Sequence, residues 1–393
     1  MRNALSPLAR LAVALVAVFG LLAVTTPAGA SIDNLTIIPS PSPGANFNRL
    51  ESVSCVSESW CIAVGQTDDG TLVLSWDGTV WTQMTSPNPA GGSQVLLNEV
   101  SCVSESFCVA VGSYELQGTD MTLVLTWNGA SWTQATSPSP GQFPNLRSVS
   151  CVSAEWCIAV GENYFQQNND ALVLLWNGSV WTQASSSVVA TTSGQDVYIN
   201  SVSCVSTSSC TAVGWYNLVP NNASAVHQTL VLSWDGISWS VADSPNIGNE
   251  DNELESVSCV TASSCVAVGY SAVAAPLVLS WNGMTWTPVT SPIPGENGGY
   301  LYSVSCVTAS SCVAVGFIVA DLTFVMSWDG STWTTVPSPN VDPENPADHL
   351  FSVSCVNSSW CVAVGETSGP TLIVGMTGTS TTPADPVAPA FTG

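Results

Sequence analysis

Residues 52–85 read SVSCVSESWCIAVGQTDDGTLVLSWDGTVWTQMT, a stretch with four short apolar segments separated by turn residues. We expect β-strands at Ser52–Cys55, Cys61–Gly65, Thr71–Trp76 and Val80–Thr85. The segments are short and rich in β-branched and aromatic residues, and Gly, Ser or Asp stands between them, which is typical of strands rather than helices. The Asp-Gly at 77–78, between two apolar runs, predicts a tight hairpin turn.

The same unit recurs along the chain, each copy marked by Ser-Val-Ser-Cys or a near match. The cysteine of this motif stands at positions 55, 102, 151, 204, 259, 306 and 355. The first and last of these are 300 residues apart over six intervals, a mean spacing of 50. Units of this length with four short strands are typical of propeller blades. The sequence therefore predicts an all-β, seven-bladed β-propeller with four-stranded blades.

The last unit departs from this pattern in its outer half. Residues 372–376 resemble the third segment, but Thr-Gly replaces Asp-Gly at 377–378 and no Trp follows. Near the other end of the chain, residues 35–44 (LTIIPSPSPG) align with residues 132–141 (WTQATSPSPG) of the second unit. We therefore expect the N-terminal strand to close the last blade, which removes an open sheet edge. In the alternative, residues 379–383 form that outer strand.

The first thirty residues have the pattern of a secretory signal peptide. A short basic start precedes an apolar run, and Ala28-Gly29-Ala30 matches a cleavage site. The expected organisation is a signal peptide at 1–30, a propeller at 31–378 and a C-terminal tail at 379–393. The mature protein would be secreted and extracellular; the alternative is a retained N-terminal anchor.

Charge excludes some classes of partner. The chain of 393 residues holds 28 acidic residues against 4 arginines and no lysine. Such an acidic protein is repelled by nucleic acids and by anionic membrane surfaces. No second apolar run is long enough to span a bilayer, so we expect no membrane insertion, and we expect a monomer.

The cysteines form an even, regular set. All 14 fall into pairs with five residues between the partners, one pair per unit. In a secreted chain this pattern predicts disulfides across short hairpins. The alternative, a redox or zinc site, lacks the nearby second pair or histidine that such chemistry needs. The predicted pairs are Cys55 with Cys61, Cys102 with Cys108, Cys151 with Cys157, Cys204 with Cys210, Cys259 with Cys265, Cys306 with Cys312, and Cys355 with Cys361.

The string Ser-Trp-Asp-Gly-x-x-Trp-Thr at 75–82 resembles the Asp-box of secreted bacterial propellers, the sialidase-type turn motif. Here the motif is one residue shorter, Asn replaces Asp at 128, 177 and 282, and the seventh copy is lost. The whole unit also looks like secreted repeat proteins of actinobacterial type. The resemblance implies a motif that stabilises the fold, not an activity. Sialidases of that group clamp their substrate with three arginines, whereas the chain beyond the signal peptide has only Arg49 and Arg147.

A ligand site is expected where the units differ, since a repeated scaffold carries function in its variable loops. The loop after the second segment grows from residues 66–70 in unit one to 215–228 in unit four. Aromatic residues gather at these loops and suit stacking against sugars or apolar side chains. The alternative is that these aromatic residues have no role in binding. The repeated segments are so similar that any rare residue must lie in a variable loop. The candidate ligand-binding residues are Tyr114, Tyr164, Phe165, Trp215, Tyr216, Tyr270, Tyr300 and Tyr302.

The sequence therefore favours a non-catalytic binding or scaffold module for a carbohydrate or other cell-surface ligand, such as a surface protein. The alternative is a glycoside hydrolase or lyase that uses loop carboxylates, although nothing selects a pair among so many acids. A purely structural role is the third hypothesis. No cofactor or metal is expected; the acidic loops at 68–69, 250–253 and 342–348 could ligate calcium but lack a recognised calcium-site spacing.

Overall fold

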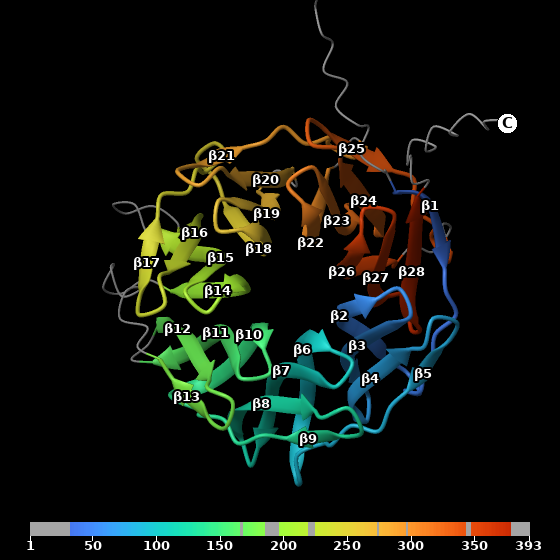
Figure 1. The fold of residues 1–393 in the computed structure, drawn as a ribbon, viewed down its shortest axis with the longest axis vertical. Coiled ribbons are helices and arrows are strands. Elements are labelled where there is room, and N and C mark those ends of the chain that lie inside the picture. Colours follow the sequence, from blue (N-terminus) through green and yellow to red (C-terminus); the bar gives the residue numbers. More distant parts are fainter. Residues whose placement is uncertain are drawn as a thin grey trace, which may run out of the picture.

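The computed structural model describes residues 32–165, 168–184, 196–218, 225–272, 275–295, 298–342 and 347–378. Within these ranges 28 strands form seven four-stranded antiparallel sheets, and no helix is found there. The sheets stand as blades around a central axis (Figure 1). The expected seven-bladed β-propeller is confirmed. The expected signal peptide and tail lie outside the described residues, and the described part holds no helix that could cross a bilayer.

Each blade is built from an innermost strand beside the axis and a second strand that returns from it. The innermost strands are β2 (Asn48–Ser57), β6 (Gly92–Ser104), β10 (Gln142–Ser153), β14 (Val197–Ser206), β18 (Asn252–Thr261), β22 (Gly299–Thr308) and β26 (His349–Asn357). The second strands are β3 (Trp60–Thr67), β7 (Phe107–Leu116), β11 (Trp156–Phe165), β15 (Ser209–Leu218), β19 (Ser264–Ser271), β23 (Ser311–Ile318) and β27 (Trp360–Glu366).

Two further strands complete each blade toward its periphery. The third strands are β4 (Gly70–Trp76), β8 (Thr119–Trp127), β12 (Asn168–Trp176), β16 (Val226–Trp234), β20 (Pro276–Trp281), β24 (Leu322–Trp328) and β28 (Thr371–Gly378). The outer strands are β5 (Trp81–Gln83), β9 (Trp132–Gln134), β13 (Trp181–Gln183), β17 (Trp239–Ala242), β21 (Trp286–Pro288), β25 (Trp333–Val336) and β1 (Ile32–Ile37).

The last blade is closed by the N-terminal strand, as expected. Strand β1 pairs antiparallel with β28, and Leu35 lies opposite Met376. The amide of Ile38 extends the ladder by donating to the carbonyl of Ile373 at 2.8 Å. Leu35 and Met376 take the places that a Trp pair holds in the other blades, for example Trp132 opposite Trp127. The ring is thus joined by hydrogen bonds between the two ends of the propeller, and β1 covers the outer edge of β28.

Strand lengths differ from those expected. Strand β2 begins at Asn48, four residues before Ser52, because residues 48–50 pair with the end of β3. These extra residues vary from blade to blade, so the repeat motif does not reveal them. The outer strand β5 is shorter than expected and ends at Gln83. It has a neighbour on one side only and runs into a Pro-containing linker.

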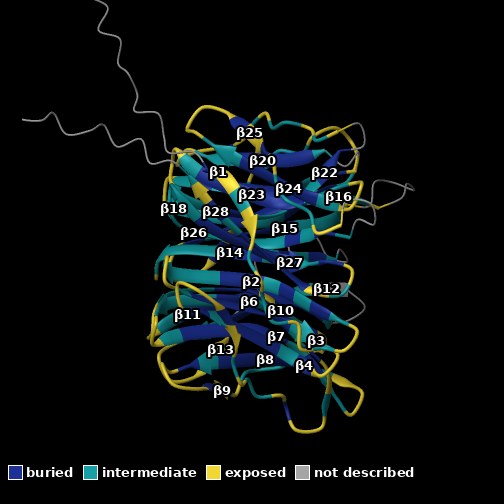
Figure 2. Ribbon diagram, turned by 90° about the vertical axis from the view of Figure 1, so that its right-hand side faces the viewer, coloured by how far each residue is buried: buried dark blue, intermediate teal, exposed yellow. Residues whose placement is uncertain are grey.

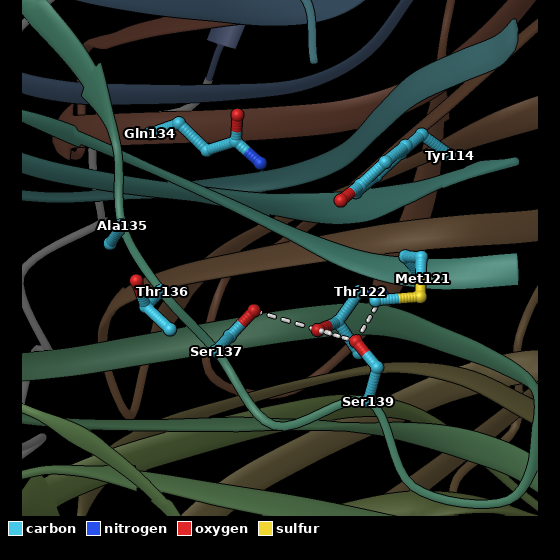
Figure 3. Close-up of a pocket in the computed structure, with 8 residues that line it drawn as sticks. All are labelled: Tyr114, Met121, Thr122, Gln134, Ala135, Thr136, Ser137 and Ser139. Atoms are coloured by element: carbon cyan, nitrogen blue, oxygen red, sulfur yellow. Dashed lines mark hydrogen bonds between the residues drawn. The ribbon is translucent and has the colours of Figure 1, made fainter. Parts of the chain in front are cut away.

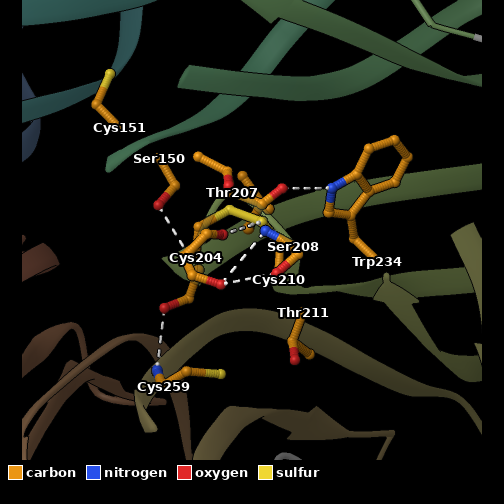
Figure 4. The surroundings of a disulfide bond; sticks show 12 residues. Ser150, Cys151, Cys204, Thr207, Ser208, Cys210, Thr211, Trp234 and Cys259 are labelled. Carbon is orange, nitrogen blue, oxygen red and sulfur yellow. Dashed lines mark hydrogen bonds between the residues drawn. A yellow bond between two sulfur atoms is a disulfide. The ribbon is translucent and has the colours of Figure 1, made fainter. Parts of the chain in front are cut away.

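The seven predicted disulfides are present, one across each hairpin between the first and second strands. In the fourth blade Cys204 and Cys210 are direct partners in the strand register (Figure 4). In all seven pairs the Cα atoms are 4.0–4.1 Å apart. The described residues include no free cysteine. Disulfides of this number are typical of an oxidising compartment, which agrees with an extracellular protein.

Neighbouring blades are joined by hydrogen bonds from backbone amides to serine hydroxyls. The amide of Val100 donates to Ser52 Oγ at 3.2 Å, and the amide of Cys102 donates to Ser54 Oγ at 3.1 Å. Equivalent pairs of bonds occur at the other interfaces, including the seam between the seventh and first blades, except that the Glu99 carboxylate replaces one serine hydroxyl between blades two and three. The Ser-Val-Ser-Cys motif is therefore the joint between blades as well as the start of each hairpin.

The turn between the third and outer strands is held by its Asp or Asn side chain. Asp77 Oδ1 accepts the amides of Thr79 at 2.8 Å and Val80 at 2.9 Å, and Gly78 has a φ of +93°, which favours glycine. Asn128 accepts the equivalent amides in blade two, so Asn serves as well as Asp. These contacts lower the pKa of Asp77, with hydrogen bonds from Thr79 as the largest cause.

The Trp pairs beside these turns belong to the scaffold. The indole of Trp76 donates to the carbonyl of Glu58 at 3.0 Å, which ties the turn to the disulfide hairpin of the same blade. Its partner Trp81 is only 2% exposed, and the two ring centroids are 5.6 Å apart. Figure 2, seen across the axis, shows the buried positions along the middle of the strands and the exposed ones at the loops.

The two ends of the propeller axis differ. Each innermost strand runs from one end to the other, so β2 starts at Asn48 on one face and reaches the disulfide hairpin on the opposite face. We call the first the mouth face and the second the hairpin face. The turns at 77–80 lie on the hairpin face, while the loop at 68–69 lies on the mouth face. The variable loops of the sequence thus surround the starts of the innermost strands.

Candidate functional site at the channel mouth

One position of the repeat faces the central channel in all seven blades. It is the residue before Ser-Val-Ser-Cys in six blades and the residue before Glu-Val-Ser-Cys, at 99–102, in blade two. The seven side chains line a single cavity of about 90 Å³ on the axis. We call them the channel ring: Glu51, Asn98, Arg147, Asn200, Glu255, Tyr302 and Phe351.

A β-bulge places these side chains. In β2, Leu50 pairs with Gly65 and Ser52 with Val64, so Glu51 is the extra residue between them. A bulge redirects the side chain of its extra residue. The glycine makes this possible, because a Cβ at Gly65 would overlap the carbonyl oxygen of Arg49. The same irregularity and the same glycine recur in the other six blades.

A second layer of side chains lies nearer the mouth face. These residues precede the channel ring by two positions, so strand alternation puts them on the same side of the sheet. We call them the rim: Arg49, Leu96, Asn145, Tyr198, Glu253, Tyr300 and His349. Neither layer repeats one residue type around the ring, although the framework residues beside them are nearly invariant.

The two arginines of the described chain lie in these layers, and both are paired. Arg49 Nε is 2.7 Å from a carboxylate oxygen of Glu51, and its Nη1 is 3.8 Å from Glu366. The guanidinium carbon of Arg49 also lies 4.0 Å above the ring of Phe351. Arg147 Nε donates to Glu162 at 2.7 Å. The cations of the channel are therefore held by carboxylates and, for Arg49, by an aromatic face.

Aromatic rings cover the part of the mouth formed by blades four to seven. In blade four Trp215 stacks on Tyr198 at 4.0 Å and on His227 at 4.1 Å between ring centroids. Strand β15, which carries Trp215, lies between the strands of its two partners, so both faces of the indole are covered. We call the whole set the aromatic arc: Tyr198, Trp215, His227, Tyr270, Tyr300, Tyr302, Phe317, His349 and Phe351.

Glu253 joins the two halves of the arc. One carboxylate oxygen lies 2.6 Å from His227 Nδ1, and the other accepts the Tyr270 hydroxyl at 2.7 Å. Tyr270 in turn meets Tyr300 edge to face, with centroids 4.8 Å apart. Burial raises the pKa of Tyr270, and the nearby carboxylates raise it further. The arc is thus a continuous series of ring contacts with one carboxylate inside it.

Glu255 differs from the other acids of the channel. Among the described residues, no hydrogen bond or ion pair satisfies its carboxylate. Burial raises the pKa of Glu255 to about 7, Glu253 raises it as well, and Arg147 opposes the shift. Burial likewise raises the pKa of Tyr302 to about 12, with Glu255 as the next cause. Within the described part of the chain, the channel ring therefore holds an acid with no hydrogen bond or ion pair, which Arg147 influences only electrostatically.

The eight predicted ligand residues do not form one site. Trp215, Tyr270, Tyr300 and Tyr302 lie in the aromatic arc. Tyr216 packs against the apolar cluster shared by blades three and four, and Tyr164 is 6.2 Å from the ring of Phe143 in blade three. Phe165 is the last residue of β11, and its side chain lies outside the described atoms.

Tyr114 lies away from the channel, on the outer part of blade two. It is 9% exposed and lines a groove of about 380 Å³ beside Met121 (Figure 3). The same groove holds a hydrogen bond of 2.7 Å between the hydroxyls of Thr122 and Ser137, a pairing repeated in other blades between the third strand and the exit linker. The groove is thus part of the repeated scaffold.

Sequence reasoning did not select Glu255, Phe317 and Phe351 of the mouth, and it considered Glu253 only as part of the acidic loop at 250–253. The signal for three of them was present: they stand one or three residues before Ser-Val-Ser, where the repeats diverge. The acidic loops make hydrogen bonds within the protein; Asp68, for example, accepts the amides of Asn46 and Phe47. The described residues contain no group of three or more His, Cys, Asp or Glu that could hold a metal.

Comparisons with known proteins support the fold alone. No protein-family description and no curated protein sequence matches the chain. Among solved structures, "YCF48 bound to D1 peptide" is similar with a TM-score of 0.56 and 12% identity, over 91% of this chain and all of that one. "YCF48 from Cyanidioschyzon merolae" gives 0.54 and 13%, over 87% and 98%. A chain of the "Crystal Structure of Mitotic Checkpoint Complex" gives 0.54 and 12%, over 94% and 98%.

Proposed function

We propose that the protein is a secreted, non-catalytic binding module whose ligand sits across the channel mouth. One observation carries this proposal: seven geometrically equivalent positions hold Glu, Asn, Arg, Asn, Glu, Tyr and Phe, while the residues around them repeat. A purely structural scaffold gives no reason for such variety at one position. A site that recognises an asymmetric ligand does, since recognition needs different groups placed around it.

The ligand is a carbohydrate or a protein at a cell surface. A sugar ring packs on an aromatic ring that has an open face, and Trp215 has both faces covered by its neighbours. The cavity of about 90 Å³ is also small beside the roughly 300–1,000 Å³ of sites that enclose whole small molecules. These two features favour a ligand that inserts one side chain and lies over the rim. A similar propeller was solved with a bound peptide, which is compatible with this mode.

Secretion is part of the proposal. Seven disulfides need an oxidising compartment to form and persist, and the first thirty residues have the composition of a signal peptide. The motif at the turns resembles the Asp-box of secreted bacterial propellers, and it holds those turns through side-chain hydrogen bonds. Both features support a soluble product released from a bacterial cell.

The experiment is an unbiased binding screen with the purified mature protein. Wild type and the variant Tyr300→Ala/Tyr302→Ala are applied to a glycan and cell-wall array and to intact cells, with and without calcium. We expect a specific signal from wild type and at least a tenfold loss in the variant. Tyr164→Ala, outside the aromatic arc, is the matched control and should bind as wild type does. Loss of the signal in Tyr164→Ala alone would move the site to blade three, and no binding by wild type would contradict the proposal.

A glycoside hydrolase is the second candidate, favoured by one feature. Glu255 has a pKa raised to about 7, which suits a general acid at neutral pH. Such an enzyme also needs a second carboxylate across a cleft wide enough for a sugar. A panel of chromogenic glycosides tests this candidate: turnover that Glu255→Gln abolishes would support it, and absence of turnover by wild type would remove it.

A further inference from the structure

The channel mouth contains two pairs of neighbouring blades in which an acid and an aromatic residue share the channel ring. In the first, Glu51 of blade one lies beside Phe351 of blade seven. In the second, Glu255 of blade five lies beside Tyr302 of blade six. All four residues line the same cavity, and in each pair the innermost strands are joined by an amide-to-serine hydrogen bond.

The first pair is complete because the chain supplies its cation. Arg49 stands two residues before Glu51, pairs with that carboxylate at 2.7 Å and lies 4.0 Å above the ring of Phe351. Glu366, at 3.8 Å, adds a second acid. This wall thus holds a guanidinium between carboxylates and an aromatic face, an arrangement that stabilises a cation by ion pairing and by the ring quadrupole.

The second pair lacks a cation of its own. The residue two positions before Glu255 is Glu253, so the strand supplies another acid where blade one supplies Arg49. Glu253 is already engaged by His227 and Tyr270. Within the described residues Glu255 has no hydrogen bond or ion pair, and it shares the cavity with Tyr302.

The remaining charges of the cavity do not supply the missing cation. Three glutamates line it, Glu51, Glu99 and Glu255, against one arginine. That arginine, Arg147, donates to Glu162, and its interaction with Glu255 is electrostatic at longer range. A cation that enters the channel therefore meets an excess of negative charge, in a protein of net charge −24.

We propose that the second pair binds the cationic end group of a lysine or arginine side chain presented by a protein partner. The group would lie between the carboxylate of Glu255 and the ring of Tyr302, as Arg49 lies between Glu51 and Phe351. The cavity, about three times the roughly 30 Å³ that one water occupies, suits the end of a side chain. This inference rests on the proposed binding function and names the ligand chemistry of the same site.

The test compares matched short peptides that differ in one side chain. Acetylated and amidated Gly-Gly-X-Gly-Gly peptides, with X as arginine, lysine or citrulline, are titrated into the mature protein and followed by NMR. Citrulline keeps the shape of arginine but has no charge. We expect the arginine and lysine peptides to bind at least tenfold more tightly than the citrulline peptide, and Glu255→Gln to remove this difference. Glu105→Gln, which changes the same charge on the hairpin face, is the control and should bind as wild type does.

Each result decides the inference. Equal binding of the arginine and citrulline peptides, or an unchanged preference in Glu255→Gln, would overturn it. If Glu105→Gln lost the preference as Glu255→Gln does, the effect would be general electrostatic attraction, which also contradicts the inference. The binding screen is a separate readout: a surface signal that depends on Tyr300 and Tyr302 but shows no cation preference would keep the proposed function and reject this ligand.

Discussion

Glu99 is the residue at which one interface between blades departs from the others. The six other blades have Ser at this position, and each hydroxyl accepts an amide from the next blade. Glu99 does the same with a carboxylate, which accepts the Val149 amide at 2.7 Å. Burial raises the pKa of Glu99 to about 7, against opposing hydrogen bonds from Ser148 and Val149. The folded protein therefore takes up a proton here more readily than the unfolded chain.

This pKa predicts a dependence of stability on pH. The pKa of Glu99 in the folded protein lies above the unfolded value of about 4.3. The contribution of Glu99 to the free energy of unfolding is therefore fully present below about pH 4.3 and is lost as the pH rises through about 7. Glu99→Ser restores the hydroxyl of the other blades and should raise the free energy of unfolding at pH 8 by about 3–4 kcal/mol, with little effect at pH 4. Urea denaturation at the two pH values measures this, with Glu105→Gln as the control. Equal differences between variant and wild type at both pH values would contradict it.

At the scale of elements, the hairpins and the closing strand follow from local sequence. Asp-Gly or Asn-Gly fixes each turn through side-chain hydrogen bonds and the positive φ of the glycine. The pairing of third and outer strands can therefore be predicted from the sequence. The alignment of residues 35–44 with other exit segments likewise predicts β1. The bulge beside Gly65 cannot be predicted from the sequence, because it depends on a carbonyl of the neighbouring strand that occupies the space of a Cβ.

The candidate site could be predicted from the sequence only in part, because it also depends on contacts between strands. The variable face was identified, and four of the eight candidate residues lie in the aromatic arc. The stack on Trp215 depends on strand register, which places Tyr198 on one side and His227 on the other. The contact of Glu253 with Tyr270 and His227 joins two blades, and no local pattern encodes it. Residue type and position predict the face; contacts between strands decide which side chains meet.

Removal of the closing strand should open the ring. A variant that begins at Pro39 lacks β1 and leaves the outer edge of β28 without a partner, whereas a variant that begins at Ser31 keeps it. We expect the shorter protein to melt at lower temperature and to form dimers or aggregates through the free edge. Thermal unfolding and light scattering after gel filtration compare the two variants. Equal melting temperatures with monomers in both would show that the seam does not need β1.

At the scale of the whole molecule, stability comes from repetition of the same joints. Each blade has its own disulfide, each pair of neighbouring blades shares an apolar cluster, and two amide-to-side-chain hydrogen bonds join each blade to the next. A disulfide with only five residues between its cysteines removes a small part of the entropy of the unfolded chain. One bridge therefore contributes little, and the set of seven contributes substantially.

Selective removal of bridges tests this view. Cys204→Ala/Cys210→Ala should lower the free energy of unfolding by about 2 kcal/mol and leave the fold intact. Reduction of all seven bridges in the wild type should cause a much larger loss. Urea denaturation with and without reductant measures both, and circular dichroism in the absence of urea checks that the variant remains folded. A single-blade variant as unstable as the fully reduced protein would contradict independent contributions.

The pairing of β1 with β28 also decides how the molecule can be attached to something else. Ile32 lies opposite Gly378, and the amide of Gly378 donates to the carbonyl of Ser359 in a disulfide hairpin. Both described ends of the chain therefore leave from the hairpin face, at one blade, opposite the channel mouth. A carrier, a sensor surface or a fused domain joined to either end would hold the propeller from behind and present the mouth outward, so one orientation serves both kinds of fusion.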